Sequence, residues 1–233
     1  MAALASDSSM AAGSPRRFRG LLVRSASAAV LGPVFLAALW YGFPWIDLVA
    51  ALAAPIMVSE WLGLTRGRLV ARVSAMTYVM ATIVALLWLR HQPELGRATV
   101  IWIVACVWAT DTGAYFLGTL AGGAKLAPRI SPGKTWSGLV GGMCWAAVAS
   151  AAMGLLFERG STVKLALAGI GVAVVSQIGD LVESAAKRDA GVKNSGSLIP
   201  GHGGLLDRID GLMAALVAAA LLRLMVGSQW PWA

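Results

Sequence analysis

Four aspartates are the side chains of this sequence best suited to bind a metal ion: Asp111, Asp180, Asp207 and Asp210. The chain is 58% hydrophobic and 13% charged, so acidic groups are scarce in it. Carboxylate oxygens suit a hard cation such as Mg²⁺, which commonly takes one or two carboxylates and completes its coordination with substrate phosphates and water. We therefore predict that the four aspartates gather into a site for Mg²⁺. Simpler interpretations stay open, since Asp207 and Asp210 can stabilise a helix N-terminus and Asp111 can pair with a basic side chain.

A glycine-rich turn, PGHGG at 200–204, stands just before Asp207. Glycines let backbone amides approach an anion closely, and a following helix N-terminus adds a positive dipole. This geometry predicts a phosphate-binding turn that includes Gly201, Gly203 and Gly204. His202 is a candidate base or ligand, and its alternative role is that of an orienting hydrogen-bond donor.

Basic and hydroxyl side chains from two polar loops can bind several phosphate groups together. They are Lys125, Ser131, Lys134, Thr135, Lys187, Arg188, Lys193 and Arg208. Helical spacing also places Ser184 and Lys187 on the same face as Asp180. For any one of these cations, the alternative is a loop charge that binds nothing. The GKT at 133–135 does not belong to a P-loop, because Pro128 stands where that motif needs its first glycine.

The elements that position these residues are apolar helices. The mean hydropathy is +0.74 and the chain contains ten tryptophans, which indicates a membrane protein. A bilayer core about 30 Å thick needs roughly 20 apolar residues of helix. On this measure we predict an all-α polytopic bundle with about seven transmembrane helices, at 25–43, 46–64, 73–89, 98–118, 138–157, 165–181 and 211–226.

Lys and Arg give the orientation of these helices. With a cytoplasmic N-terminus, 14 of the 19 basic residues face the cytoplasm, together with both long polar loops, 119–137 and 182–210. We therefore predict a multi-pass protein of the inner (plasma) membrane whose site faces the cytoplasm. The net charge of +8 is explained by cytoplasmic loops and anionic head groups, so a nucleic-acid partner is not expected. Residues 1–24 are predicted to form a disordered basic tail and 25–233 a single transmembrane domain.

The stretch from Ser184 to Asp210 resembles the C-terminal motif of the phosphatidate cytidylyltransferases, also called CDP-diacylglycerol synthases. The matching residues are SAAKR at 184–188, then Lys193, then PGHGGLLDRID at 200–210. DTGAYFLG at 111–118 and ISPGKTWSG at 130–138 are similar to further elements of that family. The resemblance therefore covers about residues 110–211, and the spacing of its motif is highly specific.

The resemblance implies that CTP and phosphatidic acid react to give CDP-diacylglycerol and pyrophosphate, with Mg²⁺ as the cofactor. It implies that Lys187, Arg188, Lys193, His202 and Arg208 act in catalysis, with Ser184 among the substrate-binding residues. Asp207 and Asp210, with Asp180 or Asp111, would hold the metal. A homodimer is an open possibility. One position departs from the family pattern, because Asn194 stands where an aspartate is usual and an amide brings no charge to a metal.

Three other functions compete with this interpretation. A secondary transporter would also carry aspartates in its helices, but it would place them near the middle of the membrane rather than at helix ends. A polyprenol or dolichol kinase is another lipid-phosphate enzyme. A catalytically inactive homologue that acts as a scaffold is suggested only by Asn194.

Overall fold

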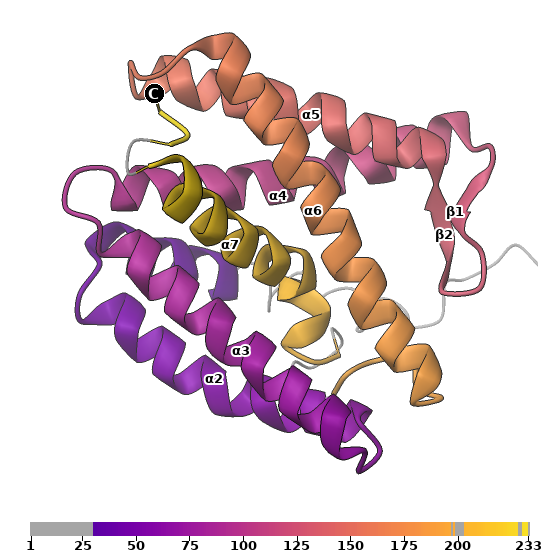
Figure 1. The fold of residues 1–233 in the computed structure, drawn as a ribbon. Helices are drawn as coiled ribbons and strands as arrows, with labels where there is room; N and C mark the ends of the chain where they lie inside the picture. Colours follow the sequence, from indigo (N-terminus) through magenta and orange to yellow (C-terminus); the bar gives the residue numbers. More distant parts are fainter. Residues whose placement is uncertain (1–29, 197, 199–202, 228–229, 233) are drawn as a thin grey trace, which may run out of the picture.

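The computed structural model describes residues 30–196, 198, 203–227 and 230–232, which form a helical bundle with one small β hairpin (Figure 1). The elements in chain order are α2 (Trp45–Leu64), α3 (Leu69–Arg90), α4 (Gly96–Ala121), β1 (Lys125–Ala127), β2 (Ser131–Thr135), α5 (Trp136–Leu156), α6 (Thr162–Asp189) and α7 (Leu206–Val226). A shorter apolar helix, Val30–Tyr41, precedes them.

The predicted all-α membrane fold is confirmed. Six helices, α2 to α7, are long and apolar enough to cross a membrane, and they correspond to the last six predicted spans. The first predicted span, 25–43, is described only from residue 30, where it forms the shorter helix. The predicted tail at 1–24 lies outside the described residues. The predicted count of seven spans is therefore approximate, whereas the predicted class, an all-α membrane protein, is confirmed.

The β hairpin was not expected from the sequence. Gly122 and Gly123 have φ angles of +58° and +96°, which end α4 in a backbone conformation that favours glycine. β1 then pairs antiparallel with β2, with Lys125 opposite Thr135. The Thr135 hydroxyl accepts a hydrogen bond from the Gly138 amide at 3.0 Å and so caps α5. The hairpin is thus fixed at the junction of α4 and α5.

Glycines allow α4 and α5 to pack very closely, and this is the most extensive helix contact of the bundle. A Cβ atom on Gly113 would lie 2.6 Å from the Gly141 carbonyl oxygen, and one on Gly141 would lie equally close to the Gly113 carbonyl oxygen. Helices in a bilayer gain little from the hydrophobic effect on association, so dispersion contacts between closely approaching backbones hold them together. Any larger residue at these two positions must push α4 and α5 apart.

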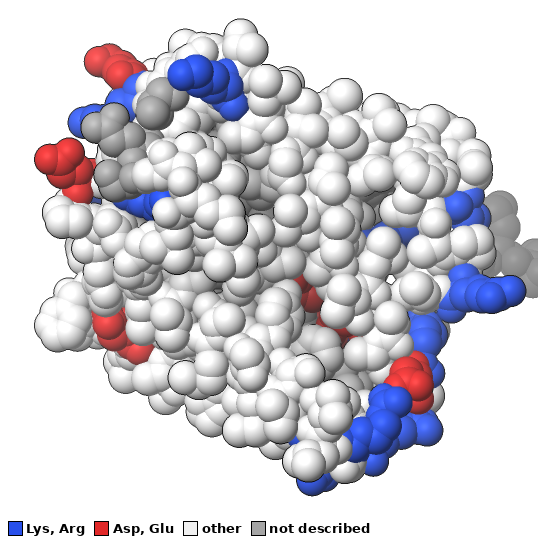
Figure 2. Space-filling view, viewed as in Figure 1, with Lys and Arg blue, Asp and Glu red and all other residues white. Residues whose placement is uncertain are grey.

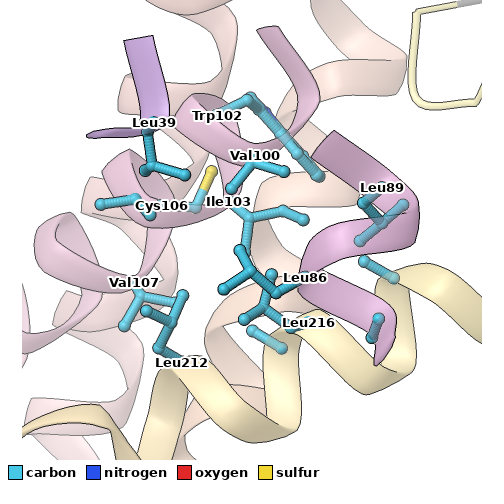
Figure 3. Close-up of a cluster of buried hydrophobic side chains, with 14 of the residues drawn as sticks. Leu39, Leu86, Leu89, Val100, Trp102, Ile103, Cys106, Val107, Leu212 and Leu216 are labelled. Atoms are coloured by element: carbon cyan, nitrogen blue, oxygen red, sulfur yellow. The ribbon is translucent and has the colours of Figure 1, made fainter. Parts of the chain in front are cut away.

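α7 is the central helix of two buried apolar clusters. The larger cluster joins α7 to α3 and α4 through side chains such as Leu86, Trp102, Ile103 and Leu216 (Figure 3). The smaller cluster surrounds the start of α7 and includes Met57, Val79, Leu206 and Met213. The first turn of α7 is therefore held by α2 and α3 as well as by its own chain.

The outer faces of the helices remain apolar. Large side chains such as Val148 and Leu167 are 70% and 62% exposed, as expected for residues that contact lipid. Lys and Arg lie at both ends of the molecule, with one group over the β hairpin and the neighbouring ends of α3 and α6 and another at the opposite end (Figure 2). Acidic atoms are also visible in a recess in the middle of this otherwise uncharged face.

Candidate active site

A buried lysine joins α6 to the first turn of α7. Lys187 Nζ lies 2.6 Å from Glu183 Oε2, one turn earlier on α6, and 2.7 Å from Asp207 Oδ1 on α7. Glu183 is 1% exposed and Lys187 is 9% exposed. Charges at such depth require close partners, because their desolvation is costly. α6 extends to Asp189, well beyond the predicted span at 165–181, so this group lies on the helix rather than in a loop.

The second oxygen of Asp207 orders the connection between α6 and α7. Asp207 Oδ2 accepts hydrogen bonds from the Ser195 amide at 3.0 Å, the Ser195 hydroxyl at 3.1 Å and the Gly204 amide at 2.9 Å. Gly203 has a φ of +89°, and a Cβ atom on it would lie 2.7 Å from this same oxygen, so a glycine is required there. Both carboxylate oxygens of Asp207 therefore have partners within the protein.

Three further carboxylates lie beside these ion pairs of Lys187. Asp111 on α4 interacts electrostatically with Asp180 on α6 and Asp210 on α7, and Asp210 adjoins Glu183. Carboxylates from three helices therefore lie within electrostatic reach of one another, and their predicted role in holding a metal ion remains a prediction. Asp180 has two neighbours of its own, because the Ser184 hydroxyl donates to it at 3.2 Å and Lys134 Nζ lies 2.6 Å away.

The acidic cluster suits a cation that is shared with a phosphate ligand. Among the described residues, Lys134 forms an ion pair with Asp180, and Lys187 forms ion pairs with Glu183 and Asp207, while Asp111 and Asp210 lie beside them. The buried Glu183 Oε1 has no hydrogen-bond partner among the described residues. Within those same residues no three His, Cys, Asp or Glu side chains stand together as a complete metal site. One or two carboxylates plus substrate phosphates is the usual arrangement for Mg²⁺, so the residues present fit that ion.

The hairpin closes over α6 through two basic residues. Lys134 on β2 pairs with Asp180, and Arg188 Nε donates to the Ile130 carbonyl at 3.2 Å. Arg188 Nη1 also donates to the Val192 carbonyl at 3.2 Å, beyond the end of α6. Thr135 is buried as the cap of α5, and Ser131 is half-buried at the start of β2. The two polar loops predicted to lie on one side do contact each other.

Other predicted residues are placed less tightly. Lys193, Asn194 and Arg208 are exposed at the end of the molecule that carries the hairpin. Gly201 and His202 lie outside the described residues, so their predicted roles remain predictions. The Gly204 amide is taken by Asp207, and a phosphate-binding role for this turn also remains a prediction.

Sequence reasoning missed two glutamates of this region. Glu183 adjoins Asp210 within the motif itself. Glu60, on α2, is 7% exposed and accepts hydrogen bonds from the amides of Leu205 and Leu206 at the start of α7, both at 2.9 Å. The signal for Glu60 was available, because it is an acidic residue inside a predicted apolar span, 46–64.

A cavity of about 310 Å³ lies elsewhere, at the opposite end of α7. Its lining includes Gln92, Glu94, Arg159, Arg223 and Trp232, and it contains no residue of the acidic cluster. We assign it no part in the chemistry.

The fold and the cluster define a polytopic helical membrane protein in which buried carboxylates from three helices meet lysines of α6 and the β hairpin. Comparison with known sequences narrows the class. The chain belongs to the cytidylyltransferase family, whose sequence profile matches residues 66–226.

Curated relatives carry the name phosphatidate cytidylyltransferase. The protein of Brucella suis biovar 1 (strain 1330) is 45% identical over 186 residues, which cover 77% of this chain and 64% of the relative. That of Haemophilus influenzae is 36% identical over 188 residues, covering 76% and 63% of the two chains. That of Rickettsia bellii is 32% identical over 200 residues, covering 83% and 86%. The chain thus spans slightly less than two thirds of the length of the first two relatives.

Proposed function

We propose that this protein transfers CMP from CTP to phosphatidic acid, giving CDP-diacylglycerol and pyrophosphate. The family membership and the names of the relatives support this reaction class. The single structural observation that carries the proposal is the buried acidic cluster beside Lys187, which the Lys134 side chain of the hairpin also contacts. A polyanionic nucleotide and an anionic lipid can meet there only if their charges are neutralised.

The reaction requires positioning more than proton transfer. A phosphate monoester is largely dianionic near neutral pH, so an oxygen of phosphatidic acid can attack the α-phosphorus of CTP directly. A bond forms from the phosphatidic acid oxygen to the α-phosphorus, and the bond between the α-phosphorus and the oxygen that bridges the α- and β-phosphates breaks. Pyrophosphate leaves with this bridging oxygen and the electron pair of the broken bond. The protein accelerates this step by holding the two phosphates in line and stabilising the charge of the leaving group.

Each group of side chains has a proposed part in this step. Arg188, Lys193 and Arg208, at the basic end, bind the lipid phosphate and the departing pyrophosphate. Lys134 and Ser131 bring the hairpin to the nucleotide, and Ser184 supports Asp180. Lys187 keeps Asp207 fixed against α6 while contributing positive charge beside the site. His202 is proposed to act on the same phosphates.

Mg²⁺ is the proposed cofactor. Asp210 would hold it together with Asp111 or Asp180. Asp207 would join them when substrate binding releases one of the hydrogen bonds that its oxygens now make. When bound, it would neutralise charge on the nucleotide phosphates. Glu183 Oε1 is buried and has no hydrogen-bond partner among the residues that the structure describes, which supports a cation near Asp210.

The proposed location is the inner (plasma) membrane, with the site facing the cytoplasm, because soluble CTP is met there and the basic residues favour that side. Phosphatidic acid would reach the site laterally from the bilayer. A homodimer is proposed only as an assembly to be tested by crosslinking in native membranes.

The experiment is incorporation of radiolabelled CTP into a chloroform-soluble product by the purified full chain in detergent with phosphatidic acid. We expect product that depends on both phosphatidic acid and Mg²⁺. A folded preparation that forms no CDP-diacylglycerol under these conditions contradicts the proposal.

A further inference from the structure

Glu60 of α2 acts as the cap of α7, although 146 residues separate it from the amide of Leu206. Its Oε1 accepts from the Leu205 amide and its Oε2 from the Leu206 amide, both at 2.9 Å. The first amides of a helix have no partner within the helix, and α7 has no cap from the side chain of its own N-cap residue, Leu205. A carboxylate at this point also interacts favourably with the helix dipole. Glu60 thus does from another helix what a capping side chain does locally.

The connection between α6 and α7 is shaped around this carboxylate. The Ser195 hydroxyl lies 3.2 Å from Glu60 Oε2 and 3.1 Å from Asp207 Oδ2, so it bridges the two acids. A Cβ atom on Gly196 would lie 2.7 Å from Glu60 Oε1, and one on Gly204 would lie 2.5 Å from Glu60 Oε2. Two glycines therefore leave the space that Glu60 occupies.

The turn between α2 and α3 contacts the beginning of this connection, where α6 ends. Arg66 donates to the Ala190 carbonyl, and Arg68 pairs with Asp189 at the end of α6. Contacts from α2 and its following turn are thus made both where α6 ends and where α7 begins. Glu60 is the buried member of this set, whereas the Arg68 and Asp189 side chains are more than half exposed.

We propose that Glu60 is a positioning residue for the cytidylyl transfer proposed above, on which this inference rests. It fixes the first turn of α7, and therefore the direction in which Asp207 and Asp210 face Lys187 and the acidic cluster. It also occupies the amides of Leu205 and Leu206, which keeps substrate phosphates away from this helix end. Glu60 lies outside the family match at 66–226, so an earlier helix of the chain supplies a part of the site's framework.

The test compares Glu60→Gln with Glu94→Gln in the full chain in detergent. Glutamine has the shape of glutamate, but it turns an NH₂ group toward one of the two amides that Glu60 accepts. Glu94 is exposed at the opposite end of the bundle and provides the matched substitution. The measurements are kcat and KM for CTP, the melting temperature, and deuterium uptake by a peptide covering the start of α7.

We expect Glu60→Gln to lower kcat by about 10- to 100-fold, as a misplacement of about 1 Å can. Its KM for CTP should stay within about threefold, because the groups that bind CTP are still present. Deuterium uptake at the start of α7 should become faster, while uptake in α4 and α5 stays as in the wild type. Glu94→Gln should match the wild type in every measurement.

Two outcomes overturn the proposal. A folded Glu60→Gln protein with wild-type kcat shows that the cap is only structural, and a loss of kcat without faster deuterium uptake shows that Glu60 acts in some other way. If Glu60→Gln does not fold, the same measurements are made on Gly196→Ala and judged by the same criteria. The added methyl group displaces the Glu60 carboxylate without removing it. The uptake measurement needs no turnover, so a wild type without product refutes the proposed reaction while the ordering role of Glu60 is still decided.

Discussion

The buried pair of Lys187 and Asp207 is expected to stabilise the fold and the site together, and Asp207→Asn tests both. The two side chains are 11% and 9% exposed and their charged atoms are 2.7 Å apart. The asparagine of Asp207→Asn can take two orientations. In one, its amide oxygen accepts from the amides of Ser195 and Gly204 and its NH₂ group faces the Lys187 ammonium. In the other, its oxygen faces Lys187 and its NH₂ group faces the two backbone amides. One set of contacts is lost in each case.

The magnitude follows from the burial of the pair. Removing one partner of a buried ion pair costs about 3–5 kcal/mol when the remaining charge is left alone. Lys187 keeps Glu183 at 2.6 Å, so we expect a smaller loss, about 2–3 kcal/mol, in the free energy of unfolding. Because Asp207 also orders the connection that Ser195 belongs to, turnover should be abolished while the protein still inserts into the membrane.

A double-mutant cycle separates the pair from its surroundings. Lys187→Met, Asp207→Asn and the double variant would be unfolded in mixed micelles with increasing SDS, and CTP incorporation would be measured in parallel. We expect a coupling free energy of about 2 kcal/mol, within the usual range for residues in contact. A coupling near zero, with Asp207→Asn as stable as the wild type, would refute the view that this pair joins α6 to α7.

Four further predictions follow from particular contacts. Excess chelator should abolish formation of CDP-diacylglycerol and added Mg²⁺ should restore it, whereas undiminished product in chelator would defeat the metal assignment. Asp210→Asn should abolish turnover with little change in stability, since the hydrogen bond that Asp210 accepts from the Gly211 amide survives in asparagine; a wild-type rate would move the metal elsewhere. Lys134→Gln should lower kcat about tenfold by releasing the hairpin from Asp180, and Arg129→Gln in the same hairpin serves as the exposed control, so equal rates for the two would contradict this role. Gly141→Val should cost about 2–4 kcal/mol of stability by separating α4 from α5, while Gly171→Val, where a Cβ meets open space, should unfold like the wild type; equal melting temperatures would refute the close contact.

A turnover measurement tests whether Asn194, in place of the family's usual aspartate, weakens the enzyme. Asn194 is exposed, and the five carboxylates of the region come from other positions. We therefore expect Asn194→Asp to change kcat by less than about threefold in the CTP incorporation assay, because Asp207 and Asp210 carry the charge at the site. A gain of about tenfold or more would mean that the amide at this position weakens the enzyme.

The sequence by itself determined the class of this protein. Apolar runs of about 20 residues specify transmembrane helices because no other regular structure satisfies the backbone inside a bilayer, and all six long helices were found where such runs occur. The nine charged residues at 179–210 and the spaced motif indicated the region of the candidate site, since ionisable groups are too costly to place at random in a membrane protein. Asp180 with Ser184 followed from helical spacing alone.

Only the tertiary structure decided which charges meet. Helical spacing does not reveal that Lys187 is shared by Glu183 and Asp207, because that depends on how α6 crosses α7. The β hairpin was also not predictable from the sequence, because its strands are short and are positioned by contacts with α6: Lys134 pairs with Asp180, and Arg188 of α6 donates to the Ile130 carbonyl. Above all, the partner of the α7 amides is Glu60, a residue from another helix. Local sequence sets where a helix begins, but the group that satisfies its first amides can come from anywhere in the chain that packing brings within 3 Å.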